Sequence, residues 1–94
     1  MTTPSPECIV YVGTYTEKLP HVDGKAEGIY VYRLERASGE LHYVSTTTGV
    51  ENPSFVTVAP SGKYLYAVEE VGGSSERPHG VVRSFRIDPE THDL

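Results

Sequence analysis

The sequence predicts an all-β fold, and two observations carry this prediction. Short runs rich in Val, Tyr and Ile alternate with turns rich in Gly, Pro and Ser, as in antiparallel sheets. In addition, Val31–Leu41 recurs as Ser84–Leu94 at an offset of 53 residues, and Val10–Val12 recurs as Leu65–Ala67 at an offset of 55. A period near 50 residues with four short strands per unit is typical of β-propeller blades. We therefore predict about two four-stranded antiparallel blades of a β-propeller.

Six strands and no helix are expected along the chain. Two of them, Ile9–Tyr15 and Ser54–Ala59, contain the segments Ile9–Val12 and Phe55–Ala59, which are apolar on both faces and are therefore predicted to be covered on both sides. A third, Leu41–Thr47, is more polar and is expected nearer to solvent. The remaining strands are expected at Gly28–Leu34, Tyr64–Glu69 and Val81–Ile87, and a seventh is expected to begin at Leu94.

The repeat divides the chain into two blades. If the strands of a blade are lettered A to D from the axis outward, residues 1–50 supply strands B, C and D of a first blade whose strand A is missing. Residues 51–94 supply strands A, B and C and the start of D of a second blade. Closed propellers commonly complete one blade with strands from both termini, so we expect the missing strand to come from a later part of a longer protein.

The predicted strand directions place the long connections together. The short turns at Pro60–Lys63, Ala37–Glu40 and Asp88–Thr91 lie at one end of the blades. The loops Thr16–Glu27 and Glu70–Gly80 lie at the other end with the connection Thr48–Pro53. Because function concentrates on loops held by a rigid scaffold, we expect the functional site at this loop-rich end.

Composition excludes several classes of function. The net charge is −5 and no basic stripe is present, which disfavours nucleic-acid partners. No apolar run approaches the roughly 20 residues of a membrane span, and no secretory leader is evident, so we expect a cytoplasmic protein without membrane partners. Cys8 has no partner for an internal disulfide. His21, His42 and His92 are isolated in sequence, so no metal and no cofactor are expected.

Three stretches together resemble the lactonase family of seven-bladed propellers, to which bacterial 6-phosphogluconolactonases belong. They are YVGTYT at Tyr11–Thr16, GIYVYRLERASGEL at Gly28–Leu41 and ENPSFVTVAPSGKYLYAVEE at Glu51–Glu70. The resemblance implies that the chain is the N-terminal portion of a seven-bladed propeller. It also implies that the complete protein hydrolyses a sugar lactone, 6-phosphoglucono-1,5-lactone, in the pentose phosphate pathway. The sequence departs from the family at Glu69-Glu70, where relatives often have Asn-Glu.

Two alternatives to a lactone hydrolase stay open: a non-catalytic propeller module that binds a ligand or protein, and an enzyme similar to the carboxy-muconate cyclases. The Arg, His and Glu residues that the resemblance associates with catalysis lie in later blades. We therefore expect the 94 residues alone to be inactive. We also expect them to self-associate through the open edges of their sheets.

Candidate site residues within the chain are polar side chains expected at the loop-rich end. Lactone hydrolysis needs a base, donors for the oxyanion and a cation for the phosphate. Glu69 and Glu70 are candidate catalytic residues, and repulsion between them would raise the pKa of one. The candidate substrate-binding residues are Asn52, Ser54, Arg77 and His79. Structural roles compete with these: one glutamate could face solvent while the other pairs with an Arg or Lys of a neighbouring blade, Asn52 could cap its own backbone, and Arg77 and His79 could be solvated loop residues.

Overall fold

The computed structural model describes residues 6–70 and 80–94 and confirms the all-β prediction. Within these ranges there is no helix, and hence none that is long and apolar enough to cross a membrane. All six predicted strands are present, with ends that differ by a few residues. The strands are β1 (Glu7–Val12), β2 (Lys18–Leu19), β3 (Val22–Asp23), β4 (Ile29–Glu35), β5 (Leu41–Thr47), β6 (Pro53–Val58), β7 (Tyr64–Glu70) and β8 (Gly80–Arg86).

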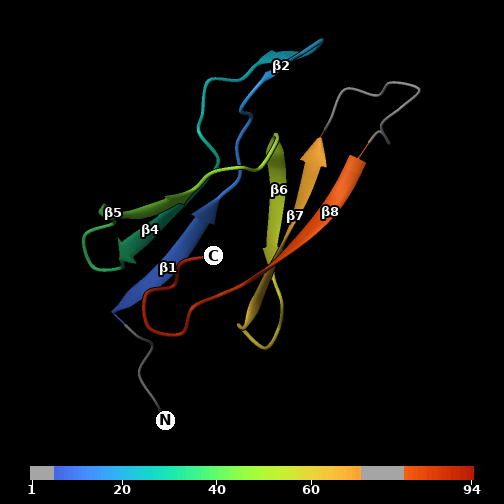
Figure 1. Cartoon of the computed structure of the whole chain (residues 1–94). Helices are drawn as coiled ribbons and strands as arrows, with labels where there is room; N and C mark the ends of the chain where they lie inside the picture. Colours follow the sequence, from blue (N-terminus) through green and yellow to red (C-terminus); the bar gives the residue numbers. More distant parts are fainter. Residues whose placement is uncertain (1–5, 71–79) are drawn as a thin grey trace.

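Two three-stranded antiparallel sheets form the body of the structure. The first sheet has the order β1-β4-β5 and the second has the order β6-β7-β8 (Figure 1). The β2–β3 hairpin lies between β1 and β4 in the sequence and was not predicted. The division into blades with a missing strand A and the start of strand D stays a prediction.

The sequence repeat is also a repeat of strand register. Tyr11 of β1 lies opposite Val31 of β4, and Tyr66 of β7 lies opposite Ser84 of β8. These pairs are related by the same offsets of 55 and 53 residues that relate the two copies in the sequence. The β1–β4 pair and the β7–β8 pair are therefore two copies of one structural unit.

The turn that follows each unit is repeated as well. The backbone N–H of Glu35 donates to the carbonyl oxygen of Glu40 at 2.9 Å, and that of Asp88 donates to Asp93 at 2.8 Å. Beyond the second turn, Leu94 lies outside any strand and packs against the core. The seventh strand accordingly stays a prediction.

The core lies where one face of the first sheet meets one face of the second. Along β7, Leu65 and Ala67 are fully buried, whereas Tyr64, Tyr66 and Val68 are exposed. This alternation is expected because successive side chains of a strand point to opposite faces. The buried cluster joins both sheets and the connection between them, and it consists of Ile29, Val50, Leu65, Ala67 and Ile87.

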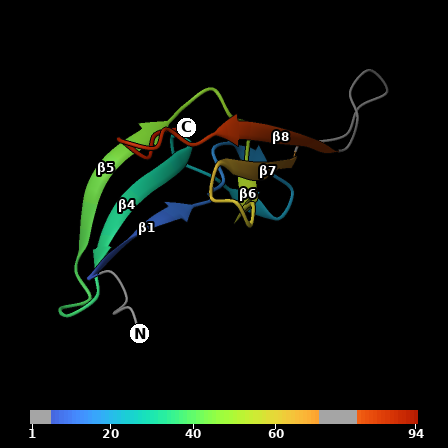
Figure 2. The same ribbon diagram turned by 90° about the horizontal axis from the view of Figure 1, so that it is seen from below.

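The prediction that Phe55–Ala59 is covered on both faces is wrong for this chain. Phe55, which lies opposite the exposed Val68 of β7, is 65% exposed. The reason is that β6 and β7 pack on the first sheet with one face only. In the described part of the chain, no element covers the other face of the second sheet, as the two sheets seen from below make clear (Figure 2).

The first strand ends at Val12 rather than at Tyr15, because the chain passes there from one sheet to the other. The backbone N–H of Thr14 donates to the carbonyl oxygen of Pro53 at 2.8 Å. A Cβ atom on Gly13 would lie 2.5 Å from the same oxygen. This close approach requires glycine and fixes the first sheet against the start of β6.

Candidate functional site

The long connections meet at one end of the two sheets, as the strand directions predicted (Figure 1). The ends of β1, β5 and β7 and the starts of β4, β6 and β8 lie there, together with the β2–β3 hairpin. The candidate residues Glu69, Glu70, Asn52 and Ser54 are all at this end. Arg77 and His79 lie outside the described residues, so their proposed binding roles stay predictions.

Asn52 joins the two sheets through its side chain, which is 1% exposed. Its Oδ1 accepts hydrogen bonds from the backbone N–H groups of Thr16 at 2.9 Å and Glu17 at 2.8 Å. Its Nδ2 donates to the carbonyl oxygen of Glu70 at 2.9 Å. With φ at 44°, the backbone adopts the left-handed conformation in which Asn is enriched. The amide is therefore engaged within the chain, and a direct contact with substrate stays a prediction.

Ser54 is placed by an irregularity in β6. The register between β6 and β7 shifts between Pro53 and Phe55, which leaves Ser54 without a partner residue in β7. Its backbone N–H donates instead to the carbonyl oxygen of Asn52 at 2.7 Å. Bulges of this kind redirect side chains, and hydrogen bonding by the Ser54 hydroxyl is the main cause that lowers the pKa of Glu70.

Glu70 is the centre of a polar group that we name the Glu70 cluster: Glu70, Ser54, Tyr15 and His21. The Tyr15 hydroxyl donates to Glu70 Oε2 at 2.7 Å, and His21 Nε2 lies 3.5 Å from Glu70 Oε1. The rings of Tyr15 and His21 meet edge to face with centroids 5.6 Å apart. The cluster thus combines the end of β7 with the start of β6 and the loop that carries the β2–β3 hairpin.

The Glu70 cluster favours an ionised carboxylate. Hydrogen bonds from Ser54 and from Tyr15 hold the pKa of Glu70 below its ordinary value; desolvation opposes them and nearby His21 assists. The hydrogen bond to Glu70 in turn raises the pKa of Tyr15, which keeps this phenol protonated as a donor. The raised pKa predicted for a glutamate pair is therefore wrong for Glu70. The two carboxylates are not paired, because adjacent residues of a strand point to opposite faces.

Glu69 lies on the core-facing side of β7 and stabilises the connection between β5 and β6. Its Oε2 accepts a hydrogen bond from the backbone N–H of Glu51 at 2.9 Å, and its Oε1 lies 3.4 Å from Nε of Arg83. Arg83 also donates to the carbonyl oxygen of Gly49 at 2.9 Å. These contacts agree with the ion-pairing role that the sequence left open. A catalytic role for Glu69 stays a prediction.

An open hollow of about 530 Å³ lies beside Glu69 at the loop-rich end. Its walls are mainly polar, and they include three glutamates. A lining with several carboxylates disfavours an anionic group such as a phosphate. The lining residues are Thr16, Glu17, Gly49, Val50, Glu51 and Glu69.

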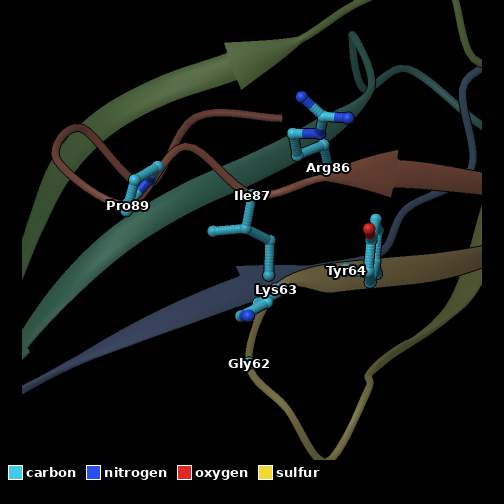
Figure 3. Close-up of a pocket in the computed structure, with 6 residues that line it drawn as sticks. All are labelled: Gly62, Lys63, Tyr64, Arg86, Ile87 and Pro89. Atoms are coloured by element: carbon cyan, nitrogen blue, oxygen red, sulfur yellow. The ribbon is translucent and has the colours of Figure 1, made fainter.

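A second hollow, of about 230 Å³, lies at the short-turn end of the second sheet (Figure 3). It is formed where β7 begins, where β8 ends and where the following turn passes over them. Figure 3 shows Tyr64 and Arg86 on neighbouring strands at its margin. Because it is at the end opposite to the Glu70 cluster, it does not belong to the candidate site.

Sequence reasoning missed Tyr15 and His21. Tyr15 lies 55 residues before Glu70, and His21 was considered only as a metal ligand. The one available signal was their position near or within the long loop after β1, at the end where function was expected. Which long-range partner a loop residue meets depends on the stacking of the sheets and is not encoded in local spacing.

His42 is not isolated, contrary to the sequence prediction. At the short-turn end of the first sheet its Nε2 lies 3.3 Å from Glu35 Oε2 and 3.7 Å from Glu40 Oε2. The ligand atoms of these three residues all lie within 4.8 Å of one another. A β-hairpin brings them together, which explains why sequence spacing alone did not. The absence of a bound metal stays a prediction.

Comparison with known proteins assigns the chain to a family. The sequence model described as "Lactonase, 7-bladed beta-propeller" matches residues 9–94. The chain belongs to this lactonase family. The β-sheets described above are accordingly a fragment of a seven-bladed propeller, and the resemblance noted from the sequence is confirmed.

Individual members of the lactonase family show how much of the propeller is present. The chain is 36% identical over 85 residues to a 6-phosphogluconolactonase of Formosa agariphila, a match that covers 90% of this chain and 22% of the relative. Crystal structures of two proteins described as candidate 6-phosphogluconolactonases are similar. The one from Bacteroides fragilis has a TM-score of 0.77 and 31% identity over 100% of this chain and 23% of its own. The one from Bacteroides uniformis has a TM-score of 0.76 and 28% identity over 95% and 23%. The chain thus spans less than a quarter of the length of these relatives.

Proposed function

We propose that the complete protein of which these residues form a part hydrolyses 6-phosphoglucono-1,5-lactone to the open acid, as a cytoplasmic enzyme of the pentose phosphate pathway. The observation that carries this proposal is membership of the lactonase family over residues 9–94, together with 36% identity to a 6-phosphogluconolactonase. Because the chain spans about 22% of that relative, we propose that the 94 residues alone do not turn over substrate.

The Glu70 cluster is the part of the chain that we propose to act on substrate. An ionised carboxylate accepts hydrogen bonds, so Glu70 is suited to hold a sugar hydroxyl or the attacking water. Its lowered pKa makes it a weak base at neutral pH, and we therefore assign it to positioning rather than to full proton transfer. The hydroxyl groups of Tyr15 and Ser54 orient the carboxylate by hydrogen bonding to it.

Binding of the substrate phosphate requires cationic groups. At the loop-rich end, Arg83 is engaged with Glu69 and with a backbone carbonyl group. His21 is exposed and lies next to Glu70. It is therefore a further candidate for contact with substrate. Among the candidate substrate-binding residues, Arg77 and His79 are the ones that we propose to contact the phosphate.

The test is lactone hydrolysis by the complete protein, measured as acid release from 6-phosphogluconolactone. We expect Glu70→Gln to lower kcat/KM by roughly 10²-fold, the size of effect that follows when loss of a positioning group misplaces the reacting atoms. Glu90→Gln is the matched control, because Glu90 is exposed in a turn at the opposite end of the second sheet. It should leave kcat/KM unchanged.

The two parts of the proposal fail in different ways. If the wild-type complete protein does not open the lactone, the proposed activity is wrong. If it does so and Glu70→Gln is as active as Glu90→Gln, the activity stands but the role of Glu70 does not.

We also propose that the 94-residue chain by itself self-associates. The support is that β5 and β6 each leave one side without a strand partner among the described residues, and such edges invite pairing.

A further inference from the structure

The turn between β4 and β5 brings together three side chains that can act as metal ligands. Glu35 is the last residue of β4, Glu40 directly precedes β5, and His42 is the second residue of β5. His42 Nε2 lies 3.3 Å from Glu35 Oε2 and 3.7 Å from Glu40 Oε2, and the three ligand atoms all lie within 4.8 Å of one another. We name these three residues the turn cluster. It lies at the end of the first sheet that is opposite to the β2–β3 hairpin and the Glu70 cluster (Figure 1).

Strand pairing places the turn cluster on one face of the hairpin. Residues two apart in a strand, and residues opposite each other on paired strands, point to the same face of a sheet. Arg33 pairs with His42, and the backbone N–H of Glu35 donates to the carbonyl oxygen of Glu40 at 2.9 Å. The turn is closed by Gly39, whose N–H donates to the carbonyl oxygen of Glu35 at 2.8 Å. Main-chain hydrogen bonds therefore hold the three side chains on one face.

The second unit of the repeat shows that this turn does not require the turn cluster. Asp88 stands 53 residues after Glu35, and its backbone N–H makes the equivalent hydrogen bond across its own turn at 2.8 Å. Oδ1 of Asp88 accepts hydrogen bonds from the backbone N–H groups of Glu90 at 2.8 Å and Thr91 at 3.0 Å, so this carboxylate stabilises its own turn. The longer side chain of Glu35 extends to His42 instead. The Glu35 carboxylate is thus available for a role other than turn formation.

The ligand types and distances in the turn cluster suit a zinc ion. Zinc bonds to His nitrogen and Glu oxygen are about 2.0–2.2 Å long, which puts two ligand atoms of a tetrahedral site about 3.3–3.5 Å apart. The distances of 3.3 and 3.7 Å from His42 are close to this value. The side chain of Glu40 is 65% exposed, so a small movement can bring its oxygen to bonding distance. Calcium and magnesium take about six or more oxygen ligands, whereas an imidazole nitrogen favours a transition metal.

We propose that Glu35, Glu40 and His42 bind one Zn²⁺ ion, with water in the fourth coordination position. The ion links the end of β4 to the start of β5 and neutralises the two carboxylates. The sequence predicts no metal because His42 is isolated along the chain, and the hairpin removes that reason at this one place. The inference does not rest on the proposed lactonase function, because the turn cluster is at the opposite end of the sheet from the Glu70 cluster.

The competing explanation is an ion pair alone, in which a protonated His42 lies between two carboxylates. His42→Arg distinguishes the two explanations. A guanidinium group keeps a positive charge beside Glu35 and Glu40, but it does not lose its proton and cannot ligate a metal. The variant therefore preserves the ion pairing and removes the zinc ligand.

The test is isothermal titration calorimetry of the complete protein, without a histidine tag, with zinc chloride in a buffer that does not bind zinc. We expect wild type to bind zinc, and we expect His42→Arg and Glu40→Gln each to weaken binding at this site by at least about tenfold. His92→Asn is the matched control, because it removes an imidazole from the equivalent turn of the second unit and Asn tolerates the φ of 65°. It should bind zinc like wild type, and calcium chloride should not compete.

Three results would overturn the proposal: no zinc binding by wild type, equal affinity in wild type and His42→Arg, or an equal loss of affinity in His92→Asn. Far-UV circular dichroism checks that the variants fold. Should His42→Arg unfold, imidazole ¹H–¹⁵N spectra of the wild-type protein supply an independent measurement. Zinc should then shift the Nε2 resonance of His42 and leave that of His92 in place, and an unmoved His42 resonance would contradict the proposal.

Discussion

Replacing Asn52 with alanine removes the side chain that ties the first long loop to the end of β7. The change leaves the backbone N–H groups of Thr16 and Glu17 without their acceptor and the carbonyl oxygen of Glu70 without its donor. The site is buried at Asn52 itself, whereas the loop residues are partly accessible to water. Rescue by solvent is therefore incomplete.

The expected loss of stability follows from these contacts. An unsatisfied buried polar group costs about 1–3 kcal/mol, and because water reaches part of the loop, we expect the three groups together to cost less than the sum of their full penalties, roughly 2 kcal/mol. Alanine at φ 44° adds about 1 kcal/mol of backbone strain. We therefore expect Asn52→Ala to lower the free energy of unfolding by roughly 3 kcal/mol.

Urea denaturation followed by circular dichroism measures this change, at a protein concentration where the chain is monomeric. Asn52→Gly is the matched control, because it loses the same hydrogen bonds and tolerates the positive φ. It should be more stable than Asn52→Ala by about 1 kcal/mol. A value for Asn52→Ala within about 0.5 kcal/mol of wild type, the usual range for surface substitutions, would refute the assignment of Asn52 as the link between the sheets.

Three further predictions concern the backbone and the pH dependence. Gly13→Ala should destabilise the chain by about 1–3 kcal/mol in the same assay, because its Cβ would lie 2.5 Å from a backbone oxygen of the second sheet. Gly80→Ala is the control and should be nearly neutral, because its Cβ would lie no closer than 3.8 Å to any neighbouring atom. His92→Gly should raise the free energy of unfolding by about 0.5–1 kcal/mol, since His92 has a φ of 65° where the equivalent turn has Gly39 at 78°; an unchanged or lowered stability would contradict this. The folded-state pKa of Glu70 lies below its ordinary value of 4.5, so its contribution to stability is complete above pH 4.5 and is lost as pH falls through the folded-state pKa. Glu70→Gln should remove that part of the acid dependence measured by urea titration across this pH range.

The six main strands were predictable because each has six or seven residues, enough to show a pattern of β-branched and aromatic residues between turns. The β2–β3 hairpin was missed because each of its strands has two residues, too few to show any period. The repeat in the sequence reappears in the structure as a repeat of register between the β1–β4 pair and the β7–β8 pair. The uncovered face of β6 was not predicted. An apolar strand indicates that both of its faces need to be buried, but it does not show whether the burying surface belongs to the same chain.

The candidate site was predictable in location and only partly in composition. Glu70 and Ser54 follow from strand ends at the loop-rich side of the sheets. Tyr15 and His21 join them through contacts that arise only after the two sheets stack. The opposite roles of Glu69 and Glu70 follow from the alternation of side chains along a strand, as in the alternative in which one glutamate faces solvent and the other forms an ion pair.

The Glu70 cluster depends on one feature, the stacking of the first sheet on the inner face of β7. Methyl NOESY spectra of the 94-residue chain test this most directly. We predict contacts between the methyl groups of Ile29 and those of Leu65, Ala67 and Ile87. Methyl contacts confined to each sheet, with none between Ile29 and β7, would contradict the account.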